Sequence, residues 1–293
     1  MYERSIRIYS VITDNDKEKN MRIQPLSLLA TSALALLLWG GLAQAALHDR
    51  GNGLIYDDVL NVTWLQDANL AATETFGVSG IDPDGRFPSC DLGRIWIDAM
   101  NAAHYKGIND WQLPDVSPVD GSTSYNHQLS YDGSTDSGFN ISAAGSAYPG
   151  SQASHLAHLH YQTLGNQGWY DVNGNRNTSA CPDDANGCLR NTGPLINMQP
   201  GFYLSSFCEQ PLGGVPAPVS LTMVFSFRSG QQAEGDVPPA AGQNFYLLPY
   251  HPGDVADLSG AKGVPTLSFR VLIILNGLLL MLGAYRLRNS SNC

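Results

Sequence analysis

The chain has 293 residues, with 16 Lys and Arg against 26 Asp and Glu, and a formal net charge of −10. Between residues 46 and 262 the imbalance is larger, because 8 basic residues face 22 acidic ones and leave a net charge of −14. An acidic surface repels phosphate backbones, so this composition argues against nucleic acid as a partner. A span of 217 residues suits one domain with a core of its own.

The N-terminal region has the pattern of an export signal. Residues 1–20 are polar and aperiodic, and we interpret them as a start-site extension. Residues 21–45 combine an early arginine, a long apolar run and an Ala-Gln-Ala ending, the three parts of a secretory signal peptide. Signal peptidase is therefore expected to cut between Ala45 and Ala46. An uncleaved N-terminal anchor is the alternative.

Two strands and a helix are predicted in the first part of the domain. Gly53–Asp57 and Val62–Leu65 have the composition of strands joined by a short turn. Arg94–Tyr105 is predicted to be helical, because its apolar residues recur at helical spacing on one face. Gly107 is placed to end that helix. Asn109–Pro114 is predicted to be a short extended segment.

Polar loops dominate the middle of the chain. Residues 115–150 show no sustained period and are predicted to form a long surface loop. A second helix is predicted over Ser154–Leu164, and residues 171–191 follow as a polar loop. Further strands are predicted at Gly201–Ser206, Leu221–Phe227 and Asn244–Tyr250. The pattern indicates an α+β fold, a single compact mixed domain over residues 46–256 with long polar loops.

The cysteines suit an oxidising compartment. Cys293 lies in the C-terminal tail, which leaves an even number in the domain. Cys181 and Cys188 flank a tight loop and are the expected disulfide pair. Cys90 and Cys208 follow by elimination, although four cysteines allow three pairings. A zinc site is the weaker alternative, because the spacing is not Cys-x-x-Cys.

One loop and one tryptophan are candidate ligand sites. Asp171, Asn173 and Asn175 alternate oxygen ligands as calcium loops do, but proline stands where the bidentate glutamate belongs, twelve positions on. A plain Asx-rich turn is therefore the preferred interpretation, and no cofactor is expected. Trp169, in a polar loop after a helix, is the best exposed candidate for stacking on a sugar ring.

Three histidines on the second helix resemble a metal cluster at first sight. At 100° per residue, His160 falls within the apolar arc, whereas His155 and His158 fall on the opposite side. We therefore predict a buried, hydrogen-bonded His160 and two surface histidines. A metal site made of His155 and His158 is the alternative.

The sequence contains no recognisable catalytic pattern. Gly-x-Ser-x-Gly, His-Glu-x-x-His and phosphate-loop motifs are all absent from it. The chain is accordingly predicted not to be an enzyme.

The tail of the chain has the layout of a second targeting signal. A linker at 257–263 precedes residues 264–293, in which an apolar run at 271–285 is followed by Arg286 and Arg288. Fifteen residues at 1.5 Å each span about 22 Å, less than the roughly 30 Å hydrocarbon core of a bilayer. The segment can still cross by borrowing neighbouring residues, and basic residues on the cytoplasmic side would place the domain outside the cytoplasm. The sequence at the outer edge of the run is Val264, Pro265, Thr266, Leu267 and Ser268.

That tail resembles the IPTL-type C-terminal sorting signals of Gram-negative bacteria, relatives of the signals read by exosortase-like enzymes. The resemblance implies an inner-membrane-anchored precursor, then release to the cell surface or the medium by an exosortase-like sorting enzyme. A plain C-terminal membrane anchor is the alternative.

The domain resembles the family once catalogued as DUF1566, named for the C-terminal domain of a Legionella collagen-like adhesin. The matching segments, in order, are Gly53–Asn69, Asn101–Pro114, Leu156–Asn166, Gly193–Ser206, Phe225–Gly230 and Leu248–Asp254. The resemblance implies a secreted or surface-attached domain of mixed strands and helices, distantly similar to C-type-lectin-like modules. The named adhesin binds sulfated glycans, a ligand that the charge of −14 does not suit. Gln112 and Leu204 stand where the family often has Arg and Trp.

These features together predict an exported, non-enzymatic binding domain, adhesin-like, whose ligand is a glycan, a matrix component or another protein. The alternatives are a secreted enzyme on a lectin-like scaffold and a structural component of the extracellular matrix.

Overall fold

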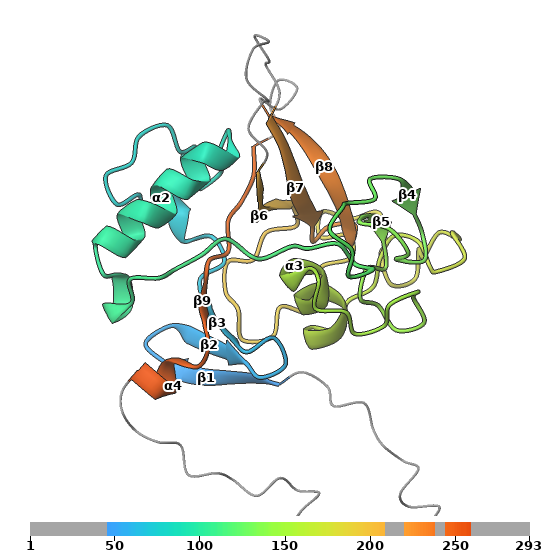
Figure 1. Cartoon of the computed structure of the whole chain (residues 1–293), viewed down its shortest axis with the longest axis horizontal. Coiled ribbons are helices and arrows are strands. Elements are labelled where there is room, and N and C mark those ends of the chain that lie inside the picture. The colour runs from blue at the N-terminus through green and yellow to red at the C-terminus, as the bar shows by residue number, and fades with distance from the viewer. Residues whose placement is uncertain (1–45, 209–219, 238–243, 259–293) are drawn as a thin grey trace, which may run out of the picture. The chain divides into compact units, whose positions relative to one another are not determined.

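Two β-sheets and a few helices make up a mixed α+β fold (Figure 1). The computed structural model describes residues 46–208, 220–237 and 244–258. The first sheet has the antiparallel order β1-β2-β3-β9. Its strands are β1 (Leu47–Gly51), β2 (Leu54–Asp57), β3 (Val62–Leu65) and β9 (Tyr250–Pro252). The predicted strand pair thus forms the β2–β3 hairpin, while β1 adds a strand that the sequence pattern did not indicate.

The second sheet has the order β4-β5-β8-β7-β6. Its strands are β4 (Leu129–Ser130), β5 (Ser137–Phe139), β6 (Phe202–Cys208), β7 (Ser220–Ser226) and β8 (Gln231–Val237). Pairing is antiparallel except between the short strands β4 and β5. Strand β8 was not predicted, because its polar sequence lacks the alternation that marks a half-buried strand.

The first predicted helix is α2 (Cys90–Ala102), which begins earlier and ends earlier than expected. Ser89 caps it, because its side chain accepts a hydrogen bond from the backbone nitrogen of Leu92. The helix ends because His104 adopts a left-handed backbone with φ of 49°, ahead of Gly107. Short helical turns stand at η1 (Leu70–Ala72) and η2 (Tyr105–Gly107), and α4 (Val255–Leu258) follows β9.

The second predicted helix changes geometry along its length. Ser154 caps a single α-helical turn, α3 (His155–His158), and a π-helical turn, η3 (Leu159–Thr163), continues it. The chain then leaves the helix through Gly165 at φ of +67°, as expected. π-turns of this kind are rare and are concentrated at functional sites.

Strands β6 and β7 are buried on both faces. Tyr203, Phe225 and Phe227 pack into one apolar cluster with Leu156 and Leu159 of the second helix. On the other face Leu204 and Val224 join a second cluster with Trp96 and Met100 of α2. In Figure 1, α2 lies to the left of these strands and α3 below them. The sheet therefore serves two cores at once.

Two predictions about irregular segments are corrected by the structure. Residues 115–150 are not all a surface loop, because residues 136–143 are buried in succession. The buried Asp136 carboxylate accepts hydrogen bonds from the backbone nitrogens of Val119 and Asn126, both at 2.7 Å, and so folds the loop inward. Residues 244–250 do not form a continuous strand, because Phe245 and Tyr246 make only isolated bridges and β9 begins at Tyr250.

The structure brings the four domain cysteines together in the expected pairs. Cys90 and Cys208 have Cα atoms 6.3 Å apart and join the start of α2 to the end of β6. Cys181 and Cys188 have Cα atoms 4.3 Å apart and close a short loop. The first pair spans 118 positions of the chain and the second only 7.

Those two loop sizes predict unequal contributions to stability. In the chain-entropy treatment a crosslink that closes about 100 residues stabilises by roughly 4.7 kcal/mol, and one that closes fewer than 15 by less than about 3 kcal/mol. The variant Cys90→Ala, Cys208→Ala should lose more unfolding free energy than Cys181→Ala, Cys188→Ala in urea titrations without reductant. Equal losses, or the reverse order, would contradict the argument. The wild type in reductant provides the control, since it lacks both crosslinks but keeps both pairs of cysteines.

Candidate functional site: an amide-lined groove beside the second helix

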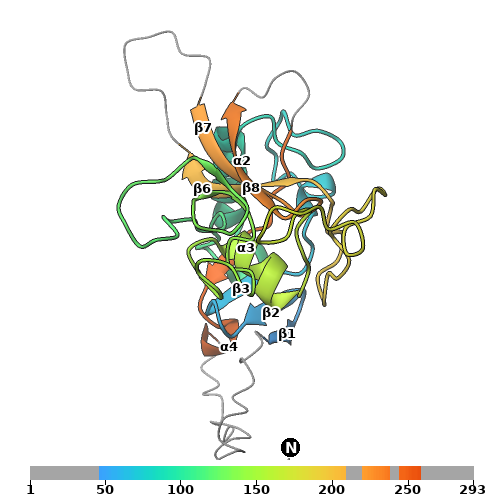
Figure 2. The ribbon, with the colours of Figure 1, turned by 90° about the vertical axis from the view of Figure 1, so that its right-hand side faces the viewer.

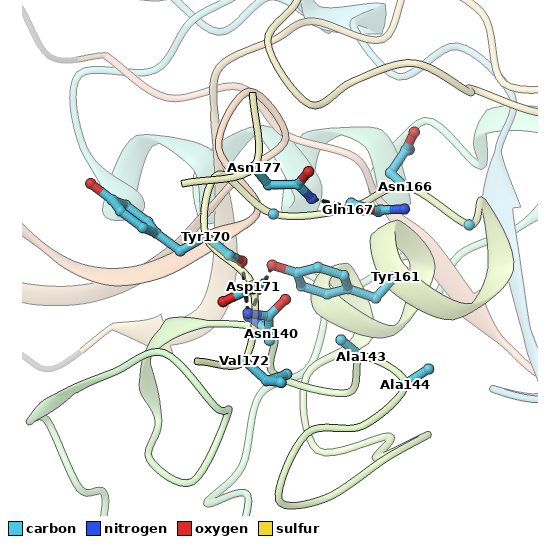
Figure 3. Close-up of a pocket in the computed structure, with 12 residues that line it drawn as sticks. Asn140, Ala143, Ala144, Tyr161, Asn166, Gln167, Tyr170, Asp171, Val172 and Asn177 are labelled. Carbon is cyan, nitrogen blue, oxygen red and sulfur yellow. Dashed lines mark hydrogen bonds between the residues drawn. The ribbon is translucent and has the colours of Figure 1, made fainter. Parts of the chain in front are cut away.

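A cavity of about 390 Å³ opens between residues 140–144, the end of the second helix and residues 165–177 (Figure 3). Amide side chains of Asn140, Asn166, Gln167 and Asn177 line it, together with the rings of Tyr161 and Tyr170. Small apolar side chains of Ala143, Ala144 and Val172 complete the lining. A second cavity of about 510 Å³ shares residues 165–167 and continues to the loop of the short disulfide. We call these two adjoining cavities the amide groove.

Tyr161 provides a fixed wall of the groove. Its buried hydroxyl donates to the carbonyl of Gly230 at 2.5 Å and accepts from the backbone nitrogen of Asn140 at 2.9 Å. Burial raises the pKa of Tyr161, so the phenol stays protonated. The contact needs glycine nearby, because a Cβ at Gly168 would lie 2.7 Å from the phenol oxygen. Tyr161 therefore shapes the groove.

The amides hold loops in place and still leave atoms free for a ligand. Asn140 Nδ2 donates to the carbonyls of Tyr131 and Tyr170, and Asn177 Nδ2 donates to Gln167 Oε1 at 2.6 Å. Asn140 Oδ1, Gln167 Nε2 and Asn177 Oδ1 make no hydrogen bond to the residues that the structure describes. Each of these three side chains is held by a hydrogen bond at its other amide atom. Two acceptor oxygens and one donor nitrogen therefore stay available in fixed positions beside the cavity.

An exposed aromatic ring lies next to the groove. Tyr131 has 39% of its surface exposed, and its ring stacks on Phe139 with an interplanar angle of 6°. The ring edge-contacts Tyr170, which lines the groove, at a centroid distance of 5.0 Å. Gly174 lies against the same ring, because a Cβ there would approach it to 3.3 Å. The ring is therefore rigidly supported and keeps exposed surface.

The calcium-candidate loop folds onto itself. The Asp171 carboxylate accepts from the backbone nitrogens of Asn173 and Asn175 at 2.9 and 2.8 Å, and from Asn175 Nδ2 at 3.0 Å. These bonds lower the pKa of Asp171, the Asn175 side chain contributing most. The geometry is that of an Asx turn. Among the described residues no three His, Cys, Asp or Glu side chains gather as a metal site would require.

Trp169, the candidate for ring stacking, already has cationic partners. The guanidinium carbons of Arg176 and Arg228 lie over its ring, 4.9 and 5.9 Å from the centroid. The side chain is only half-exposed, and its indole nitrogen is buried. The tryptophan therefore anchors the loop beside the groove, and Tyr131 is the better exposed ring.

The three histidines do not converge, but two of them are placed differently from the prediction. His160 is buried as expected, with Nε2 3.0 Å from the carbonyl of Gln167. His158 is also buried, at 2% exposure, and His155 is half-buried against Trp64 and Tyr250. Both lie in the α-helical turn, ahead of the π-turn, so the cause is tertiary packing: residues 142–151 cover His158, and Trp64 and Tyr250 cover His155.

A separate cleft of about 390 Å³, distinct from the amide groove, lies between α2 and β6. Arg94 donates to the carbonyl of Ser206 at 3.2 Å, and the Ser206 hydroxyl donates to Asp115 at 2.9 Å. Gln112 lines the cleft and accepts from the Tyr250 hydroxyl at 3.0 Å. Leu204 is fully buried, in the apolar cluster that includes Trp96 and Met100 of α2.

Sequence reasoning missed the wall of the groove formed by residues 140–144. The stretch lies inside the segment predicted to be a surface loop, where Gly, Ser and Asp hide any period. The one available signal is Phe139-Asn140-Ile141, a small apolar island that the structure buries. Within residues 166–177 the sequence indicated Trp169 and the Asp171, Asn173 and Asn175 loop as candidates, but not the amides of Asn166, Gln167 and Asn177.

Comparison with family models, with curated proteins and with solved structures finds no match to this chain. In the part of the chain that the structure covers, none of the helices has both the length and the apolarity to cross a bilayer. The predicted export signal, the motif at 264–268 and the apolar run at 271–285 lie outside the described residues.

The buried His160 predicts acid sensitivity of the fold. Burial lowers the pKa of His160 to about 4, against about 6.5 in an unfolded chain. The unfolded state therefore binds more protons between these values, and stability falls as pH drops from about 6.5 to 4. We expect a loss of roughly 2 kcal/mol in unfolding free energy between pH 7 and pH 5 from this residue.

The measurement is urea unfolding of the wild type and of His160→Gln at both pH values. The variant should lose less stability on acidification, since glutamine does not titrate. His104→Gln, at an exposed histidine, should keep the wild-type slope. A His160→Gln protein with an unchanged pH slope would show that the histidine does not carry the effect.

Proposed function

We propose that this chain is an exported, non-enzymatic binding protein and that its domain takes a neutral glycan into the amide groove. The observation that carries the proposal is the set of amide atoms on Asn140, Gln167 and Asn177 that make no hydrogen bond within the described residues, on side chains that line the cavity together with small apolar ones. Sugars present hydroxyl groups together with C–H faces. Oriented amides suit the hydroxyls, and small apolar side chains and a supported ring such as Tyr131 suit the C–H faces.

The charge of the domain argues for a neutral ligand. A sulfated or phosphorylated polymer would meet a net charge of −14 between residues 46 and 262. The guanidinium groups of Arg176 and Arg190 beside the groove are engaged with Asp183 and Asp184, at 2.9 and 2.7 Å. Anionic ligands would have to break these pairs first.

The geometry gives less support to an enzyme. Ser142 Oγ lies 3.4 Å from His158 Nδ1, a contact that resembles a nucleophile and its base. Both side chains are buried, and the same nitrogen faces the carbonyl of Ser151 at 3.1 Å. A substrate has no access to that pair, so we assign it a structural role. The lectin-like arrangement implied by the family resemblance belongs to the same proposal.

A cavity-filling substitution tests the binding site. Ala144 lines the groove with an exposed side chain, so Ala144→Trp should fill the cavity without removing a core contact. We expect at least a tenfold loss of affinity for the best neutral glycan found on an array of neutral and sulfated sugars. Ala147→Trp, at an exposed alanine of the same loop outside the cavity lining, is the matched control and should bind normally. Equal binding by both variants would place the ligand elsewhere.

The proposed route to the cell surface is tested at the tail. Recognition by a sorting enzyme needs a particular sequence at the outer edge of the apolar run, whereas an anchor needs only length and apolarity. Pro265→Ala with Thr266→Ala should therefore leave unprocessed precursor in the inner membrane. Mass spectrometry and fractionation provide the measurement. Identical mass and fraction for wild type and variant, with the tail retained in both, would favour the plain anchor.

A further inference from the structure

The first described residue makes a contact that export would change chemically. The backbone nitrogen of Ala46 donates to the Asp58 carboxylate at 2.9 Å. In return the backbone nitrogen of Asp58 points at the carbonyl of Ala46, at 3.4 Å. Asp58 lies directly after β2, where the chain turns toward β3. Ala46 is also the residue at which the signal-peptide pattern, an independent feature, predicts the mature chain to begin.

The contact is the first of three that reach a carboxylate. They are made by alternate residues, from Ala46, just before β1, to Arg50 within it. His48 Nε2 lies 3.2 Å from the other oxygen of the Asp58 carboxylate. Arg50 bonds both oxygens of Asp254, at 2.8 and 2.5 Å. The ring of Tyr56 lies between, stacked with His48 at 6.1 Å and 5.0 Å from the Arg50 guanidinium. Donor groups of β1 therefore face carboxylates throughout its length.

We infer that Asp58 is the binding site for the α-ammonium group that cleavage after Ala45 creates. Signal peptidase adds water across the Ala45–Ala46 peptide bond, so that Ala45 leaves as a carboxylate and Ala46 keeps a protonated amine. Before the cut, the Ala46 nitrogen is a neutral amide with one proton to donate. After the cut it is a cation with three donors, and the same contact becomes a charge-assisted hydrogen bond. This step goes beyond ligand binding and does not depend on it.

The bond matters because β1 is an edge strand. It pairs with β2 on one side only, and its side chains are half-buried or exposed. Such a strand opens easily, since few apolar contacts hold it. The Arg50–Asp254 pair joins it to the start of α4, and both views show β1 and α4 side by side (Figures 1 and 2). Fixing Ala46 on Asp58 therefore secures the other end of a strand already tied at Arg50.

The test uses the full chain expressed with its own export signal. Mass spectrometry first determines whether the exported protein begins at Ala46. Its α-amine is then acetylated near neutral pH, where a free amine with pKa of about 8 reacts ahead of lysines with pKa of about 10.4. Hydrogen exchange of the β1 amides is compared before and after. An exposed ion pair of ordinary strength should change the opening equilibrium of β1 by roughly 2- to 5-fold.

Asp58→Asn separates the charge from the shape of the contact. Asparagine keeps an acceptor oxygen, so the strand can still pair, but acetylation of this variant should have no further effect on exchange. Asp120→Asn, at an exposed carboxylate in another turn, is the matched control and should respond to acetylation like the wild type. His48→Gln shows how much of the Asp58 effect belongs to the histidine.

The pKa of the Ala46 α-amine gives a second readout. It would not change if Asp58 only supported the shape of the turn. Asp58 contacts the amine directly, His48 contacts the same carboxylate and stacks with Tyr56, and the Arg50–Asp254 pair lies further along the strand. Asp58 should raise that pKa, and Asp58→Asn should return it to its ordinary value. The stabilisation is then present below the unfolded pKa of the amine and is lost as pH rises through the folded one.

Three results would overturn the inference. The exported chain could begin at a residue other than Ala46. Acetylation of the wild type could leave β1 exchange unchanged. Acetylation could also act equally on wild type and Asp58→Asn. None of these outcomes bears on the amide groove, so the glycan proposal is judged separately by the Ala144 and Ala147 variants.

Discussion

The burial of β6 and β7 on both faces is the constraint on which the rest of this domain depends. Their alternating residues contribute to two cores, one shared with α2 and the other with the second helix. Both helices begin at a serine cap, at Ser89 and Ser154. The Cys90–Cys208 pair then joins α2 to β6 covalently. A defect in β6 or β7 is therefore felt in both halves of the fold.

The amide groove takes its shape from the same strands. Residues 228–230 turn the chain from β7 to β8, and the carbonyl of Gly230 accepts the Tyr161 hydroxyl. The π-turn brings Tyr161 to that carbonyl while His160, one residue earlier, holds the carbonyl of Gln167. Two neighbouring side chains thus fix the sheet, the helix and the 165–168 segment relative to one another. The ligand site proposed here is a consequence of core packing and needs no loop to close over it.

The elements that could be predicted from the sequence are those whose residues show a recognisable pattern, such as hydrophobic periodicity. The β2–β3 hairpin follows from strand-forming residues on either side of a short turn, α2 follows from helical spacing, and β7 shows its apolar face directly. Strand β8 carries Gln, Glu and Asp and is recognisable only by its partner β7. Residues 136–143 are folded inward where the Asp136 carboxylate accepts hydrogen bonds from the backbone nitrogens of Val119 and Asn126. These partners lie 17 and 10 residues away, so no local sequence pattern indicates them. The groove was missed for the same reason, since two of its walls, residues 140–144 and 165–177, come from segments that have no period.

The local balance of charge explains how an acidic domain can present a neutral site. Three carboxylates lie in the loops of the groove, Asp171, Asp183 and Asp184, and three guanidinium groups accompany them, Arg176, Arg190 and Arg228. Hydrogen bonds lower the pKa of Asp184, the Arg190 side chain contributing most, so the pair stays ionised and matched. The excess negative charge therefore lies elsewhere on the domain. Polyanions are repelled at long range. A neutral ligand that reaches the groove meets amide groups and small apolar side chains, beside the ion pairs Arg176–Asp183 and Arg190–Asp184.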